Sequence, residues 1–135
     1  MTGAGPRYPA VMPSTVQHAV ETYRRRLDGL RAIDAAAGDL ERRLSDHRRS
    51  LFALNAERQR IESGAPSPYQ DVKRAIAQRL SEIAVAASAA QAEIDRLSAE
   101  LSRLQERRGA AARLLARCKE YLAQEHAVSE RDLAW

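Results

Sequence analysis

Residues 80–104 read LSEIAVAASAAQAEIDRLSAELSRL, and the spacing of their apolar side chains decides the fold. The apolar positions alternate at intervals of three and four residues: Leu80, Ile83, Ala87, Ala90, Ile94, Leu97, Leu101 and Leu104. On an α-helix this alternation places all of them on one narrow stripe, as is typical of a coiled-coil seam. We therefore predict a long helix that packs against a partner helix along this stripe.

A second apolar ladder of the same kind precedes this one and supplies the partner. It begins near Val16 and ends near Ile61, and the sequence Gly-Ala-Pro-Ser-Pro at residues 64–68 separates the two ladders. Glycine and proline interrupt helices, and so short a break reverses the chain direction. The predicted fold is all-α: a long antiparallel two-helix coiled-coil hairpin with an extended N-terminal arm. We expect the hairpin to assemble into a larger helical bundle.

Capping signals predict the boundaries. Ser14 with Gln17 forms a capping box, Ser67 before Pro68 forms a second N-cap, and Gly64 ends the first helix in a left-handed conformation. The predicted organisation is an extended Pro-containing arm at 1–13, a hairpin at 14–126 and a C-terminal tail at 127–135 with a short helical turn. Within the hairpin, helices span about 14–63 and 68–126, with a turn at 64–67. The arm is held either by its own hairpin or by a neighbour.

The register of the hairpin is predicted from matching large residues with small ones. The numbers of facing residues then add up to about 134. Leu44 faces Ala90 in this register, and Val20 faces Leu114 or Leu115.

Residues 83–92 contain no charged side chain, which a solvent-exposed helix does not require. Opposite the seam, the second helix carries Val85, Ala89, Ala92 and Ala99. Small side chains let another helix approach closely, so this pattern predicts a surface for self-association or for a protein partner. The alternative is alanine enrichment that serves helix propensity alone.

The C-terminal tail carries Leu133 and the only tryptophan, Trp135. The tail either folds back on its own hairpin or anchors in a neighbouring protein, because tryptophan is enriched at the energetic centres of interfaces. Both residues therefore join Val85, Ala89, Ala92 and Ala99 in the predicted partner interface.

The charge pattern favours ion pairs along the helices. Twenty-two basic and eighteen acidic residues give a net charge of +4, and arginine supplies 20 of the basic residues. Many arginines follow an acidic residue by three or four positions, a spacing that favours pairing on one helix; examples are Asp39–Arg43, Asp46–Arg49, Glu57–Arg60 and Glu93–Arg96. The alternative is a strip that contacts phosphates. No aromatic residues interleave with the arginines, so nucleic acid is not the expected partner.

We expect no enzymatic activity, cofactor or metal site. The sequence holds no Gly-rich phosphate loop or nucleophile motif, and its three histidines, His18, His47 and His126, are scattered. His47 occupies a ladder position and is interpreted as a polar seam residue. Cys118 also lies on a ladder and is interpreted as a small core residue, with an intermolecular disulfide or a reactive thiol as alternatives.

The sequence shows no apolar run of membrane-spanning length and no signal-peptide pattern near Met1. We expect a protein of the virion or of the bacterial or host cytoplasm.

Three functions are compatible with these features. The first hypothesis is a non-enzymatic structural or adaptor subunit of a large assembly, specifically a small bacteriophage virion protein of the tail, collar or fibre-attachment region. The second follows from architecture: residues 14–126 resemble the stalk and escort proteins of flagellar and type III secretion export, which are also small, basic, antiparallel coiled-coil hairpins. That resemblance implies an accessory protein that is monomeric in isolation. The third hypothesis is a nucleic-acid-binding helical protein.

Overall fold

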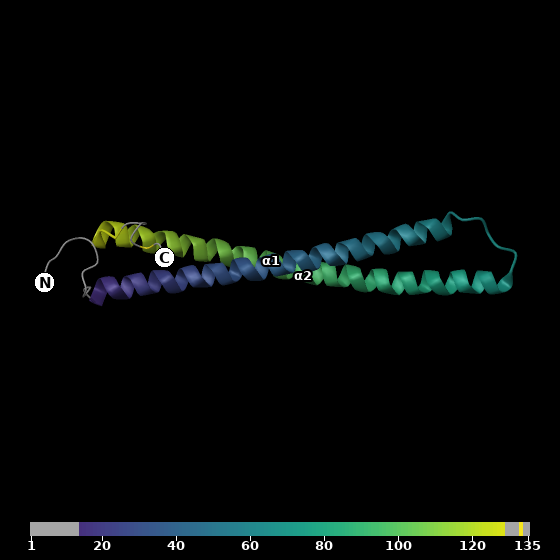
Figure 1. Ribbon diagram of the computed structural model, residues 1–135, viewed down its shortest axis with the longest axis horizontal. Coiled ribbons are helices and arrows are strands. Elements are labelled where there is room, and N and C mark those ends of the chain that lie inside the picture. The colour runs from purple at the N-terminus through teal and green to yellow at the C-terminus, as the bar shows by residue number, and fades with distance from the viewer. Residues whose placement is uncertain (1–13, 129–132, 134–135) are drawn as a thin grey trace. The chain divides into compact units, whose positions relative to one another are not determined.

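The computed structural model describes residues 14–128 and Leu133. They form two α-helices that contact each other extensively, as in a hairpin: α1, Ser14–Glu62, and α2, Gln70–His126 (Figure 1). The predicted all-α class and the two long helices are confirmed. The predicted arm at 1–13 lies outside the described residues, as does most of the predicted tail.

The chain divides into two compact units, and both helices contribute to each. Unit 1 comprises Met1–Ala36 and Leu104–Trp135, and unit 2 comprises Ala37–Arg103. The division on α1 falls within the stretch between Gly29 and Gly38, although α1 itself continues through it.

Unit 1 has a core in which the beginning of α1 packs against the end of α2. Its buried members are Val20, Tyr23, Leu122, Val128 and Leu133. The partly buried side chains of Val16, Ala19, Leu27, Leu115 and Cys118 pack around them. Because early residues of α1 meet late residues of α2, the helices run antiparallel within this unit. Cys118 is a free thiol at the edge of this core, in line with its interpretation as a small core residue.

Unit 2 buries the two predicted ladders against each other. Its buried residues are Leu40 and Leu44 on α1 and Ile83, Ala90, Ile94 and Leu97 on α2. All six occupy predicted seam positions, so the 3–4 spacing identified them correctly. Near the turn, the Arg79 guanidinium donates two hydrogen bonds to the Glu57 carboxylate, Nε to Oε2 at 2.6 Å and Nη2 to Oε1 at 2.7 Å. This bidentate ion pair joins the two helices of unit 2 and fixes which residues face each other near the turn.

The ion pairs between the helices differ from the predicted register by unequal amounts. In unit 2 Glu57 contacts Arg79, two residues from the predicted facing position. In unit 1 the Asp34 carboxylate contacts Arg108 at 2.5 Å, whereas the predicted register places Glu100 opposite Asp34. Val20 and Leu115 nevertheless belong to the same core, as the predicted register requires. Sliding one ladder by a heptad still sets apolar residues opposite apolar residues, so the ladder alone does not determine the register.

The end of α1 differs from the prediction that Gly64 adopts a left-handed conformation. No glycine among the described residues has a positive φ. Instead, the Ser63 backbone N–H and hydroxyl both donate to the Gln59 carbonyl, at 3.0 and 2.6 Å. The Gly64 N–H donates to the Ile61 carbonyl at 3.2 Å, which tightens the last turn. These bonds satisfy the terminal carbonyls without a left-handed residue.

The start of α2 is two residues later than predicted. The first helical backbone bond runs from the Lys73 N–H to the Tyr69 carbonyl at 3.0 Å, so α2 begins at Gln70 instead of Pro68. The Ser67 hydroxyl still accepts the Tyr69 N–H at 3.1 Å. Ser67 therefore makes a cap-like contact just before the helix.

The end of α2 contains the one positive φ found among the described non-glycine residues, 54° at Ala127. This left-handed residue reverses the chain, and the Val128 N–H then donates to the Leu122 carbonyl at 3.0 Å. The reversal brings Val128 into the unit 1 core. Alanine is disfavoured in this conformation because its Cβ crowds the backbone.

Two substitutions test these helix ends. Ala127→Gly relieves the left-handed strain and is expected to raise the free energy of unfolding by about 0.5–1 kcal/mol. Gly64→Ala is expected to be neutral or to stabilise by up to about 1 kcal/mol, because alanine tolerates a negative φ and orders the unfolded chain. Urea unfolding followed by far-UV circular dichroism measures both. A clear loss of stability in Gly64→Ala would show that Gly64 is left-handed in solution.

The contact between Glu57 and Arg79 predicts a pH-dependent stability. The hydrogen bond from Arg79 lowers the pKa of Glu57 below 4.5. A lowered pKa in the folded state stabilises the fold above pH 4.5, and this contribution is lost as the pH falls through the folded-state pKa. Glu57→Gln should therefore melt at a lower temperature than the wild type at pH 7, and the gap should close in acid. Asp46→Asn, which removes a solvent-exposed pair within α1, is the control and should have the smaller effect. A gap that persists at acid pH would contradict the assignment.

Candidate interaction site

The predicted interface residues on α2 lie in unit 2 and face away from its core. Val85 is 69% exposed, and Ala89, Ala92 and Ala99 are exposed as well. On the opposite side of the same helix, Ile83, Ala90, Ile94 and Leu97 are buried against α1. Val85, Ala89 and Ala92 follow one another over two turns with no charged residue between them, and we refer to these three as the apolar back face.

Ala99 is separated from the apolar back face by a charged residue. Arg96 lies four residues after Ala92 and three before Ala99, a spacing that places all three on the same side of α2. Arg96 donates from Nε to Glu93 Oε1 at 2.5 Å, and its Nη1 lies 3.7 Å from Glu100 Oε1. The Arg96 hydrogen bond lowers the pKa of Glu93. The uncharged surface therefore ends at Ala92.

Further exposed apolar side chains belong to unit 2, and the sequence analysis did not place them in the predicted interface. Phe52, the only phenylalanine, is 76% exposed on α1. Tyr69 and Val72 are also exposed, at the beginning of α2. Phe52 directly follows the ladder residue Leu51, so its position off the seam was a signal that could have identified it. Exposed large apolar side chains are typical of protein contact surfaces when they gather in one patch, and Leu114 and Tyr121 of unit 1 are exposed as well.

Of the two tail residues in the predicted interface, Leu133 and Trp135, the structure describes one. Leu133 is only 3% exposed and packs in the unit 1 core with Val20, Tyr23, Leu122 and Val128. Trp135 lies outside the described residues. In the described conformation Leu133 is thus engaged with its own chain, one of the two arrangements that the sequence left open for the tail.

The predicted helix-surface ion pairs are present in part. Asp46–Arg49 and Glu93–Arg96 form as predicted. Asp39 pairs with Arg42 at 3.3 Å instead of Arg43, and Glu57 pairs across the helices with Arg79 instead of with Arg60. Among the described residues, salt bridges include Arg42, Arg49, Arg58, Arg79 and Arg96 in unit 2 and Arg108 in unit 1.

His47 is half-buried at its ladder position. The pKa of Glu93 is lowered mainly by Arg96, with smaller contributions from His47 and Arg43, so both of these α1 residues lie near Glu93 across the unit 2 seam. Over residues 14–128 and Leu133 no group of three or more histidine, cysteine or acidic side chains is arranged to hold a metal ion. Neither helix, over the part of the chain that is described, is long and apolar enough to cross a membrane.

The chain matches no protein-family model, no curated protein and no solved structure. Its function is therefore inferred from the surfaces of the two units.

The burial of Leu133 yields a test. Leu133→Ala removes a side chain from the unit 1 core and is expected to lower the free energy of unfolding by about 2–4 kcal/mol. Leu114→Ala removes a leucine of the same unit that is 40% exposed, and it should cost about 1 kcal/mol or less. Urea unfolding of the two variants measures the difference. Equal stability of Leu133→Ala and the wild type would show that the tail does not pack on this core in solution.

Proposed function

We propose that this chain is a non-enzymatic structural subunit of a larger assembly, in which copies of the chain associate through the apolar back face of unit 2. The observation that carries the proposal is the 69% exposure of Val85 in the middle of a stretch, residues 83–92, without any charge. A helix that met only water on this side would gain solubility from charged residues here, as the rest of α2 does.

The energetics of two paired helices support association. Ordering each residue costs about 1–2 kcal/mol of backbone entropy, and one seam supplies only a few large buried side chains. Fully burying a side chain such as Val85 contributes about 1.5–3 kcal/mol, and a symmetric contact counts this gain twice. The alanines at 89 and 92 let two helix axes approach to about 8 Å. Self-association through this face therefore adds a second buried stripe to α2.

The hypotheses drawn from the sequence differ in what they require of this face. A virion subunit, the specific version of our proposal, occurs in multiple copies and uses the face for contacts between copies. An export stalk or escort protein works as a monomer and leaves the face free of other copies. A nucleic-acid binder would instead lose affinity steeply as salt rises.

The decisive measurement is the absolute mass of the purified chain in solution, by light scattering after size exclusion. We expect a defined oligomer, and we expect Ala89→Glu to weaken its association at least about tenfold, because the new carboxylate must be desolvated in the contact. Ala75→Glu, which adds the same charge at an exposed position of α2 outside the face, is the matched control and should leave the oligomer intact.

Circular dichroism of both variants should show unchanged helix content, so that loss of the oligomer reports on the contact and not on folding. A monomeric wild type would refute self-association through this face. An oligomer that Ala75→Glu breaks as readily as Ala89→Glu would place the contact elsewhere.

A further inference from the structure

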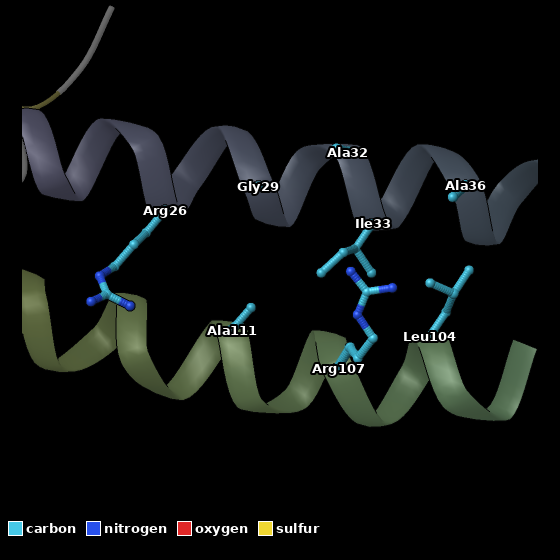
Figure 2. A pocket seen from close by; sticks show the side chains of 8 residues that line it. All are labelled: Arg26, Gly29, Ala32, Ile33, Ala36, Leu104, Arg107 and Ala111. Atoms are coloured by element: carbon cyan, nitrogen blue, oxygen red, sulfur yellow. The ribbon is translucent and has the colours of Figure 1, made fainter.

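Unit 1 contains a groove between α1 and α2 that the proposed function does not use (Figure 2). Its volume is about 440 Å³. Its lining combines small, apolar and basic side chains: Arg26, Gly29, Ala32, Ile33, Ala36, Leu104, Arg107 and Ala111.

The groove forms because small residues on both helices occupy positions where larger side chains would fill the space between the helices. Gly29, Ala32 and Ala36 supply the α1 side, and Ala111 supplies part of the α2 side. A Cβ built on Gly29 would meet no other atom within 4 Å, so the space above it is open. The half-buried side chains of Ile33 and Leu104 complete the apolar lining. The result is an apolar hollow that follows the direction of the two helices.

The charged residues of the groove are all basic. Figure 2 shows Arg26 extending from α1 toward α2 and Arg107 extending from α2 toward α1. Across residues 14–128, no salt bridge or hydrogen bond engages either guanidinium. The nearby carboxylate of Asp34 is already held by Arg108 at 2.5 Å, and no acidic residue lines the groove. Two cations without a counter-charge therefore flank the apolar hollow.

A second groove in unit 1, of about 360 Å³, shares Arg26 with the first. It adds His18 and Arg117, and again no acidic side chain lines it. The unmatched basic character thus continues along the same helix pair, over several turns toward the end of α2. This length suits an extended partner better than a small anion.

We propose that this basic groove of unit 1 binds an acidic amphipathic helix of a partner protein. The apolar side chains of that helix pack on Ile33 and Leu104, above the open space at Gly29. Its glutamates or aspartates pair with Arg26 and Arg107, whose planar guanidinium groups match carboxylates with two parallel hydrogen bonds. The complex is a helix laid into a hydrophobic groove, with apolar residues of the partner spaced by three and four.

Charge complementarity selects this occupant over two others. A second copy of the chain would offer the apolar back face, but residues 83–92 contain no carboxylate that could pair with Arg26 or Arg107. A nucleic acid would supply negative charge, but the 440 Å³ groove has no aromatic side chain on which a base could stack. The apolar lining around Ile33 and Leu104 would then remain in contact with phosphates and water.

The test uses the full chain and a fluorescein-labelled peptide of about six helical turns, built from leucine, alanine and glutamate with leucines spaced by three and four. A matched peptide carries lysine at every glutamate position. We expect fluorescence anisotropy to show one-to-one binding of the acidic peptide and no binding of the basic one. Arg26→Glu and Arg107→Glu should each weaken binding at least about tenfold by reversing a paired charge.

Two further variants separate groove binding from general attraction to a basic protein. Gly29→Leu keeps every charge, favours the helix and fills the hollow, so it should weaken binding at least about tenfold. Arg48→Glu removes an exposed arginine of unit 2 and is the matched charge control, which should bind nearly as the wild type does. Ala89→Glu should also bind normally, so failure of self-association and failure of this proposal are distinguishable.

Several results would overturn the proposal: no binding of the acidic peptide, equal losses in Arg48→Glu and Arg26→Glu, or full binding by Gly29→Leu. A single-stranded oligonucleotide serves as the competing probe. If it binds more tightly than the peptide, depends on Arg26 and Arg107 and is insensitive to Gly29→Leu, the arginines form a phosphate-contacting strip instead.

Discussion

A helix that packs against a single neighbour buries only one stripe of its surface, and this constraint governs both units. In unit 2 the stripe consists of the ladder residues around Leu44 and Ile83, and the rest of each helix faces water. Such a surface is stable in water where charged side chains cover it, as the i,i+3 pair of Glu93 and Arg96 does on α2. Charged side chains are missing around Val85, where the exposed surface is apolar, and our proposal of self-association rests on this surface.

A single seam buries few side chains. Polar contacts between the helices and residues at the chain ends therefore contribute a larger share of the stability than they would in a globular core. In unit 2 the bidentate ion pair between Arg79 and Glu57 connects the two helices close to the turn. In unit 1 the left-handed Ala127 precedes Val128, and Val128 and Leu133 are buried in the same core as Val20 and Leu122. Alanine occupies position 127 although glycine suits this conformation better, and the burial of Val128 next to it offsets the local strain.

The sequence predicted the buried side chains, which follow from the periodicity of the ladders. It did not predict the individual side-chain contacts between the two helices. Spacing of three and four identifies Ile83 and Leu97 as buried because each side chain's direction follows from its position on the helix. The same spacing is unchanged when one helix slides by a heptad, so the ladder alone does not determine which residues face each other. The predicted register already places Arg26 within one residue of the position facing Arg107, but the groove between them was not identified, because a hollow depends on the side-chain volumes of both helices and not on spacing alone. The Gly64 prediction failed because a tightened last turn satisfied the same carbonyls.

The two exposed surfaces have opposite requirements for their partners. A symmetric contact places each residue near its own copy, so an uncharged face around Val85 can pair with itself, whereas a basic face would repel itself. The groove at Arg26 and Arg107 carries unmatched positive charge, so its partner must differ from it in charge. The surfaces also belong to different units, and no residue contributes to both. The proposed self-association therefore uses residues of unit 2 and the proposed binding of an acidic helix uses residues of unit 1, so substitutions at one surface test one proposal without changing the side chains of the other.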